Sequence, residues 1–383
     1  MERFKTLRKE RAESYIDYSM IFIILFLLAF GLVMLYSTSS YEANLDFGDS
    51  AYYFRHQLIP TLIGLGGMVL LSYFPYRFFK NLALVIYVGA LAFLFALIPF
   101  GKVINGAKRW LNIAGFSVQP AEICKIAAII FSATIIAKLQ KNLMTAKGLA
   151  VTLVPTFFMA ILVYKITDNL SSGVIILGIV GLMLFISTPN YKPYIIIAVS
   201  GLGACAAIVW FISSSAGNPE MGFRSERILA WLDPNAHASG KGFQTLQALY
   251  AIGSGGIFGK GLGESMQKMG FIPEAQNDMI FSIICEELGL FGAIAVMLMF
   301  LILIWRLMII ANNAPDMFGA LLVIGVMAHI SIQVILNIAV VTNTLPNTGI
   351  TLPFISYGGS AVIMQLAEIG IALNVARNIG RAD

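Results

Sequence analysis

The chain has 383 residues, of which 58% are hydrophobic and only 12% are charged. Soluble domains carry about 25% charged residues, so this composition excludes a soluble globular protein and indicates a polytopic membrane protein. The net charge of +5 lies mainly in the segments between apolar runs, so it reflects membrane topology and gives no reason to expect a nucleic-acid partner. The three cysteines and three histidines show no metal-ligand spacing, which argues against a disulfide framework and a zinc site.

Apolar runs recur along the whole chain. Residues 1–17 are polar and basic, and the first run after them lacks a small-residue cleavage site, so we interpret that run as a retained span. At about 20 residues per crossing, the sequence predicts an all-α bundle of about ten transmembrane helices. The runs cover residues 20–36, 58–75, 82–100, 120–138, 148–164, 173–188, 193–213, 279–305, 319–341 and 360–376.

The distribution of basic residues predicts the orientation. With the N-terminus inside, more than half of the 25 Lys and Arg residues fall on the inner side, as expected for cytoplasmic segments. Both termini, 1–17 and 377–383, are then cytoplasmic. The large loop 214–278 between the seventh and eighth helices is extracytoplasmic. No repeat or linker divides the chain, so residues 1–383 are expected to form a single membrane domain.

A cluster of polar residues enters the eighth apolar run, and Asp278 lies at its mouth. A carboxylate between water and a low-dielectric wall can have a raised pKa and can accept a proton from a bound hydroxyl. Asp278 is therefore the leading catalytic candidate. The alternative is a helix N-cap shared with Asn277, worth about 1 kcal/mol. Glu286 and Glu287, two turns further in, are expected to provide structural support.

The segment before the fourth run combines cations with an aromatic residue. Lys108 and Arg109 precede Trp110, and Pro120 opens a helix whose first turns hold Glu122 and Lys125. One interpretation is a cationic cradle for a phosphate-bearing lipid head group. The other is that the first three residues anchor the chain at the membrane interface and that Glu122 pairs with Lys125 for structure.

The long loop adds two more cations and a glycine-rich run. Helical spacing places Arg224 and Arg227 on one face. The run from Gly253 to Gly263 departs twice from a phosphate-binding P-loop, because Ser254 replaces its first glycine and Gly261 follows the lysine where Ser or Thr is needed. We therefore predict tight turns and no nucleotide binding, with backbone able to approach a head group closely.

Residues 343–360, before the last run, contain two prolines and three glycines. A broken polar stretch at membrane depth is tolerated only where protein buries it or where it lines a cavity. Ser356, Tyr357 and Ser360 could offer hydroxyls to such a cavity, and packing or capping is the alternative.

Three groups of motifs, in order, cover nearly the whole chain. They are Asn105-Gly-Ala-Lys-Arg-Trp110 with Gln119-Pro-Ala-Glu122, Pro273-Glu-Ala-Gln-Asn-Asp-Met-Ile-Phe281 with Glu286-Glu-Leu-Gly289, and Thr348-Gly-Ile-Thr-Leu-Pro-Phe-Ile-Ser-Tyr-Gly-Gly-Ser360. Together they resemble the FtsW/RodA/SpoVE family, the shape, elongation, division and sporulation (SEDS) proteins, with a leaning toward the FtsW/SpoVE branch. Ala121 stands where the family usually has Ser.

The resemblance implies a bacterial peptidoglycan glycosyltransferase that polymerises lipid II at the outer face of the cytoplasmic membrane, in cell division or shape maintenance. It also implies a class B penicillin-binding protein as the partner transpeptidase. The family's essential aspartate falls on Asp278, the expected general base. The other residues expected to bind substrate are Lys108, Arg109, Trp110, Lys125, Arg224, Arg227, Glu274, Asn277 and Ser356. A divalent cation such as Mg²⁺ or Mn²⁺ could help to hold the lipid diphosphate, and no other cofactor is expected.

Two other functions fit parts of the sequence. A transporter that flips the lipid precursor would use charged residues inside the membrane, such as Glu122, Glu286 and Glu368. The polar residues concentrate on one face and no inverted repeat is visible, which favours the polymerase. A scaffold that only recruits a penicillin-binding protein would fit if Asp278 had no catalytic role.

Overall fold

The computed structural model describes residues 17–379, except 105–106, 114, 144, 189–190, 215–222 and 241. Ten helical segments in this part of the chain are long and apolar enough to cross a membrane, which confirms the predicted fold class. They are α2 (Tyr18–Phe47), α3 (Tyr52–Tyr73), α4 with α5 (Arg77–Phe95 and Leu97–Phe100), α6 (Pro120–Leu139), α7 (Ala146–Thr167), α8 (Leu170–Ser187), α9 (Lys192–Ser214), α12 (Ile280–Asn312), α13 (Met317–Val341) and α14 (Gly359–Arg377).

Several helices are longer than the apolar runs that predicted them. The first run ended at residue 36, whereas α2 continues to Phe47 and ends at Gly48, a left-handed C-cap with φ of 67°. The start of α2 is capped by Asp17, whose carboxylate accepts from the backbone N–H of Met20 at 3.0 Å. Hydropathy detects the apolar part of a helix, whereas capping residues decide where the helix ends.

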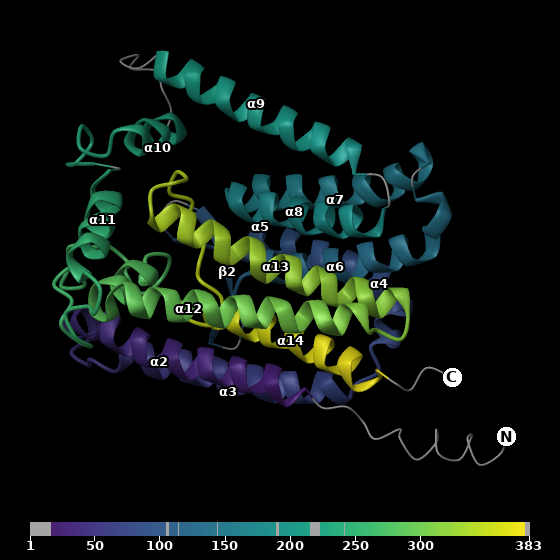
Figure 1. Cartoon of the computed structure of the whole chain (residues 1–383), viewed down its shortest axis with the longest axis horizontal. Coiled ribbons are helices and arrows are strands. Elements are labelled where there is room, and N and C mark those ends of the chain that lie inside the picture. The colour runs from purple at the N-terminus through teal and green to yellow at the C-terminus, as the bar shows by residue number, and fades with distance from the viewer. Residues whose placement is uncertain are drawn as a thin grey trace.

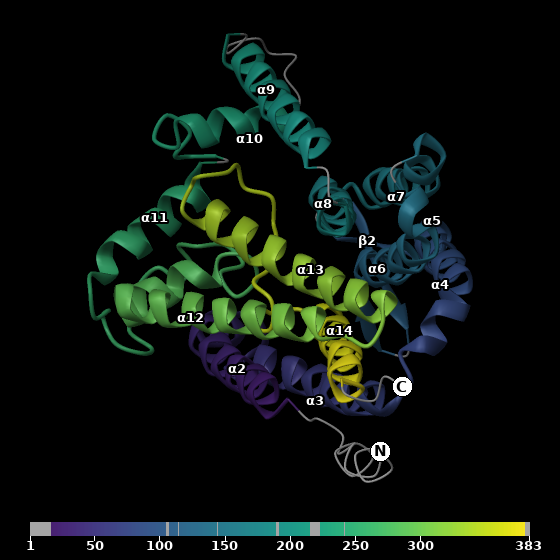
Figure 2. The same ribbon diagram turned by 45° about the vertical axis from the view of Figure 1, so that its right-hand side comes forward.

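The core of the bundle is formed by α6, α13 and α14, the most deeply buried of the long helices (Figure 2). Small residues let the helices approach one another, as is usual in membranes. A Cβ added at Gly370 of α14 would lie 2.7 Å from the carbonyl oxygen of Met68 in α3, and one added at Gly325 of α13 would meet Ile129 of α6 at 2.5 Å.

A small antiparallel sheet follows α5 and was not predicted from the sequence. Its strands are β1 (Lys102–Ile104), β2 (Ala107–Ile113) and β3 (Phe116–Val118), in the order β1-β2-β3. Two of the strands have only three residues, too few for an alternating pattern to be recognised. The sheet places Lys108 and Arg109 on its central strand.

The insertion 214–278 contains the helices α10 (Phe223–Leu232) and α11 (Phe243–Gly255). These helices lie at one end of the bundle, and the described ends of the chain, near residues 17 and 379, lie at the other (Figure 1). In both views α9 stands apart from the other long helices. The turn that carries Asp278 is the last part of the insertion and leads directly into α12.

Candidate active site

The turn that carries Asp278 is held by two other segments. Asn337 of α13 donates hydrogen bonds to the carbonyl oxygens of Asp278 at 2.8 Å and Ile350 at 2.7 Å. The backbone N–H of Tyr357 donates to the carbonyl oxygen of Gln276 at 2.9 Å. The broken stretch before α14 therefore packs against this turn, and α13 joins the two.

The carboxyl group of Asp278 is partly buried in this arrangement. Burial raises its pKa from 3.8 to about 6; the negative charge of Glu274 adds to this effect and the positive charge of Arg227 opposes it. Gly349 lies close to the carboxylate, since an added Cβ there would stand 3.8 Å from Oδ2. A carboxylate with this pKa is ionised at neutral pH and is a stronger base than an ordinary aspartate.

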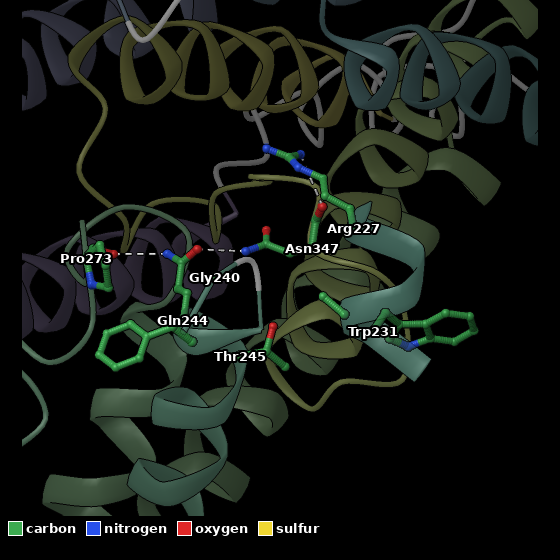
Figure 3. A pocket seen from close by; sticks show the side chains of 9 residues that line it. Arg227, Trp231, Gly240, Gln244, Thr245, Pro273 and Asn347 are labelled. Atoms are coloured by element: carbon green, nitrogen blue, oxygen red, sulfur yellow. Dashed lines mark hydrogen bonds between the residues drawn. The ribbon is translucent and has the colours of Figure 1, made fainter. Parts of the chain in front are cut away.

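A polar cavity of about 230 Å³ opens beside this turn (Figure 3). It lies between α10, α11 and the loop after α13. Gln244 and Asn347 point toward each other, joined by a hydrogen bond of 2.8 Å from Asn347 Nδ2 to Gln244 Oε1. The residues that line it are Arg227, Ala230, Trp231, Gly240, Phe243, Gln244, Thr245, Pro273 and Asn347.

The glycine-rich run packs on a break in α12. Gly289 has a φ of 67° and a ψ of −165°, which interrupts the helix, and only glycine adopts this conformation easily. The freed backbone groups are paired with the run: Lys260 N–H donates to Glu286 C=O at 2.9 Å, and Leu290 N–H donates to Gly256 C=O at 2.9 Å. The close backbone approach expected of these glycines is thus made to α12.

Glu286 and Glu287 are fully buried in this contact, and each forms an ion pair with a lysine of the long loop. Lys260 Nζ lies 2.6 Å from Glu286, and Lys268 Nζ lies 2.7 Å from Glu287. Ser37 of α2 also donates to Glu287, at 2.8 Å. Through these two carboxylates α12 holds the long loop and, at Glu287, also α2. This is the structural support expected from the sequence.

Lys108 and Arg109 donate to nearby carbonyl oxygens. Lys108 Nζ lies 3.0 Å from the carbonyl oxygen of Ile98, and Arg109 bonds the carbonyl oxygens of Thr167 at 3.1 Å and Asp168 at 3.2 Å. These bonds tie the small sheet to α5 and to the turn between α7 and α8. Trp110 follows on the same strand and is partly buried.

Other expected substrate contacts also have partners within the protein. Lys125 is 1% exposed and pairs with Glu122 at 2.8 Å, one of the alternatives that the sequence left open. Ser356 is buried and its hydroxyl oxygen accepts from Leu352 N–H at 2.8 Å. Asn277 donates to the Glu274 carboxylate at 3.0 Å. Their roles toward substrate stay predictions.

Arg224 lies on α10, three residues before Arg227, and its side chain falls outside the described part of the chain. Arg227, in contrast, lines the cavity and acts on Asp278. Among the described residues, no group of three or more His, Cys, Asp or Glu side chains could hold a metal ion.

Sequence reasoning missed Asn337, Gln244, Asn347 and Gly349. Asn337 did carry a signal, because an amide inside the apolar run 319–341 needs a buried partner. The other three come from two segments far apart in the sequence, Gln244 from α11 and the other two from the loop after α13, and only the folded chain brings them to the Asp278 turn.

Comparison with known proteins places the chain in a family. A profile of the FtsW/RodA/SpoVE family, described as a cell cycle protein, matches residues 18–380. Stage V sporulation protein E of Bacillus subtilis is 37% identical over 365 residues, covering 94% of this chain and 97% of that protein. A protein of Trichlorobacter lovleyi named "Probable peptidoglycan glycosyltransferase FtsW" is 36% identical over 377 residues, covering 97% and 96%.

Solved structures agree with the fold. A chain from a peptidoglycan synthase complex superposes with a TM-score of 0.77 at 25% identity and covers 95% of this chain and 98% of that chain. The rod shape determining protein RodA of Thermus thermophilus superposes with a TM-score of 0.69 at 23% identity, covering 95% and 97%, and shares the fold. These matches confirm the resemblance that the motifs indicated, and the chain belongs to the FtsW/RodA/SpoVE family.

Proposed function

We propose that this protein is a peptidoglycan glycosyltransferase that polymerises lipid II at the outer face of the bacterial cytoplasmic membrane. The observation that carries the proposal is the Asp278 carboxyl group, which is partly buried at the start of α12, lies near Arg227 and has a pKa of about 6. The similar proteins named FtsW and the superposed chain of a peptidoglycan synthase complex support the same activity. The similarity to FtsW and to a sporulation protein supports a role in division or sporulation.

Asp278 acts as the general base in this reaction. Its carboxylate takes the proton from the 4-hydroxyl of the acceptor sugar, and the freed oxygen forms a bond to the anomeric carbon of the donor. The bond from that carbon to the diphosphate oxygen breaks, and undecaprenyl diphosphate leaves with the electron pair. Attack opposite the leaving group inverts the anomeric centre and yields a β-linked glycan from an α-linked donor.

The leaving diphosphate gains negative charge as the bond breaks, so it needs cations near it. Arg227 is the best placed, since its charge already acts on Asp278, and arginine can bind phosphate oxygens in pairs. Arg224 on the same helix is a second clamp. Lys108 and Arg109 lie on β2 and would have to exchange a carbonyl partner for the diphosphate.

The proposed orientation places both termini in the cytoplasm and the insertion outside, as the basic residues indicate. The glycan strands then form on the side where they are cross-linked. A class B penicillin-binding protein is the proposed partner for that second reaction, and the chain superposed from a peptidoglycan synthase complex supports such an assembly.

The purified protein with its partner synthase should convert lipid II into glycan strands. We expect Asp278→Ala to abolish polymerisation while the variant remains folded and bound to the partner. Full polymerisation by the variant would remove Asp278 from the mechanism. A wild-type protein that moved lipid II across vesicles without making polymer would be a transporter, and one that did neither would be a scaffold.

A further inference from the structure

We propose that the cavity between α10, α11 and the loop after α13 is the subsite for the acceptor's N-acetylated amino sugar, with Gln244 and Asn347 recognising its polar groups. This inference rests on the proposed function and deepens it. It names the residues that select the acceptor, as distinct from the carboxylate that activates it.

The size of the cavity favours a single sugar ring. Its volume of about 230 Å³ is below the roughly 300–1,000 Å³ of pockets that enclose drug-sized ligands. A disaccharide with its peptide and diphosphate is much larger and would have to extend outside. One amino-sugar ring is the part of the substrate that matches the cavity.

The chemistry of the lining favours a neutral, polar ligand. Among the nine described residues that line the cavity, Arg227 alone is charged. A diphosphate is usually held by several converging cations, whereas hydroxyl and acetamido groups are matched by side-chain amides, which both donate and accept hydrogen bonds. Gln244 and Asn347 supply two such amides, and Thr245 adds a hydroxyl.

The two amides are held in place before any ligand binds. Asn347 Nδ2 donates to Gln244 Oε1 at 2.8 Å, Gln244 Nε2 donates to the carbonyl oxygen of Pro273 at 3.0 Å, and Arg227 donates to the carbonyl oxygen of Asn347 at 3.4 Å (Figure 3). Each side-chain amide nitrogen carries two hydrogens, and the first two of these bonds use one hydrogen of Asn347 and one of Gln244. A fixed pair of amides binds a ligand at a lower entropic cost than mobile side chains would.

The cavity and Asp278 share their walls. Pro273 lines the cavity and belongs to the turn that ends at Asp278, and Asn347 lies two residues before Gly349, which is close to the carboxylate. Arg227 lines the cavity and also acts on Asp278. A sugar ring in the cavity would therefore present one edge toward the proposed base.

The test separates the two substrates of a single transfer. A labelled lipid II analogue epimerised at the 4-position of its terminal amino sugar can only donate, and unlabelled lipid II then serves as the acceptor. With the purified protein and its partner synthase, Gln244→Ala should raise the KM for the acceptor about tenfold, the upper range for one hydrogen bond, and leave the KM for the donor within about twofold. Asn235→Ala, at an exposed position of the same insertion, is the control and should change neither value.

A second acceptor tests recognition directly. Lipid II that lacks the N-acetyl group on its terminal sugar should be a poorer acceptor for the wild-type protein, and Gln244→Ala should largely remove this difference. If the amides only brace the loops, both acceptors would slow equally and the ratio would not change, which would overturn the inference. So would an equal rise in the KM for the donor.

Two further arms keep the result clear. If Gln244→Ala does not fold, Asn347→Ala removes the other amide of the pair and should show the same loss of discrimination. Absence of any transfer by the wild-type protein would overturn the proposed function itself. Normal transfer with unchanged discrimination in the variants would overturn only the acceptor subsite.

Discussion

Asn337, inside α13, donates to the backbone carbonyl oxygen of Asp278 at 2.8 Å and holds Ile350 with its other hydrogen bond. One side chain thus joins the turn that carries the proposed base to the loop that faces it. Because a buried carbonyl group that loses its donor costs about 1–3 kcal/mol, the position of Asp278 depends on a residue that need not touch substrate.

Asn337→Ala should lower kcat for polymerisation by about tenfold or more, since a shift of the base by a fraction of an ångström is costly. The KM for lipid II should change little, because the binding surfaces remain. Asn313→Ala removes an exposed hydrogen bond, from the side-chain amide of Asn313 to the carbonyl oxygen of Ile309, at the opposite end of α12. This control should leave kcat unchanged. Equal activity of the two variants would show that Asn337 does not position Asp278.

The rate of polymerisation should depend on pH through Asp278. The base acts when ionised, so kcat/KM should rise between pH 5 and 7 with a midpoint near the pKa of about 6. Arg227→Gln should move this midpoint upward, because the charge of Arg227 lowers the pKa of Asp278. Arg55→Gln, at an exposed ion pair, is the matched control. A midpoint near 4, or no shift in the Arg227 variant, would contradict the assignment.

Asp278 should also affect stability. Its pKa is about 6 in the folded protein and 3.8 ordinarily, so the folded protein holds the proton more tightly than the unfolded chain does. The stability that this carboxyl group contributes is therefore fully present below pH 3.8 and is lost as the pH rises through 6. Asp278→Asn removes this loss and should be as stable as the wild type or more so at pH 8, by up to about 3 kcal/mol. Thermal unfolding in detergent measures the difference. A marked loss of stability at pH 8 would indicate that the carboxylate has a structural role.

Gly289 should tolerate no side chain. A Cβ there would collide with the backbone of Ile257 and Gly259, so Gly289→Ala should separate the glycine-rich run from α12 and sharply reduce the yield of folded protein. Gly263 has a φ of +89° and no atom within 4 Å of an added Cβ. Gly263→Ala should therefore cost only the backbone strain, about 1–2 kcal/mol. Similar yields of the two variants would contradict the close packing of Gly289 against Ile257 and Gly259.

The buried pair Lys268–Glu287 should show strong coupling. Removing one partner leaves an unpaired buried charge, so Lys268→Met or Glu287→Gln should each cost about 3–5 kcal/mol. The double variant should cost less than the sum, as measured by the shift in Tm. Arg55→Met, at an exposed pair, should cost less than about 1 kcal/mol. Additive effects of the two buried substitutions would mean that the pair does not interact.

Local patterns predicted much of this protein. The ten spans follow from hydrophobic runs, and Asp278 stands out because a polar cluster entering an apolar helix has few purely structural explanations. The motif order also indicated the family that the comparisons confirm. The small sheet was missed because its outer strands have three residues each.

The sequence by itself determined the membrane fold and the family, because hydropathy and motif order are properties of contiguous segments. Only the tertiary structure decided which residues surround Asp278. Asn337 lies 59 positions away in the chain, and Gln244 and Asn347 are separated by 103. Helix packing also buried the Lys125–Glu122 pair, which the sequence had left as one of two alternatives, and brought the charge of Arg227 to act on the proposed base. Contacts over such separations depend on how the helices pack, which no local pattern encodes.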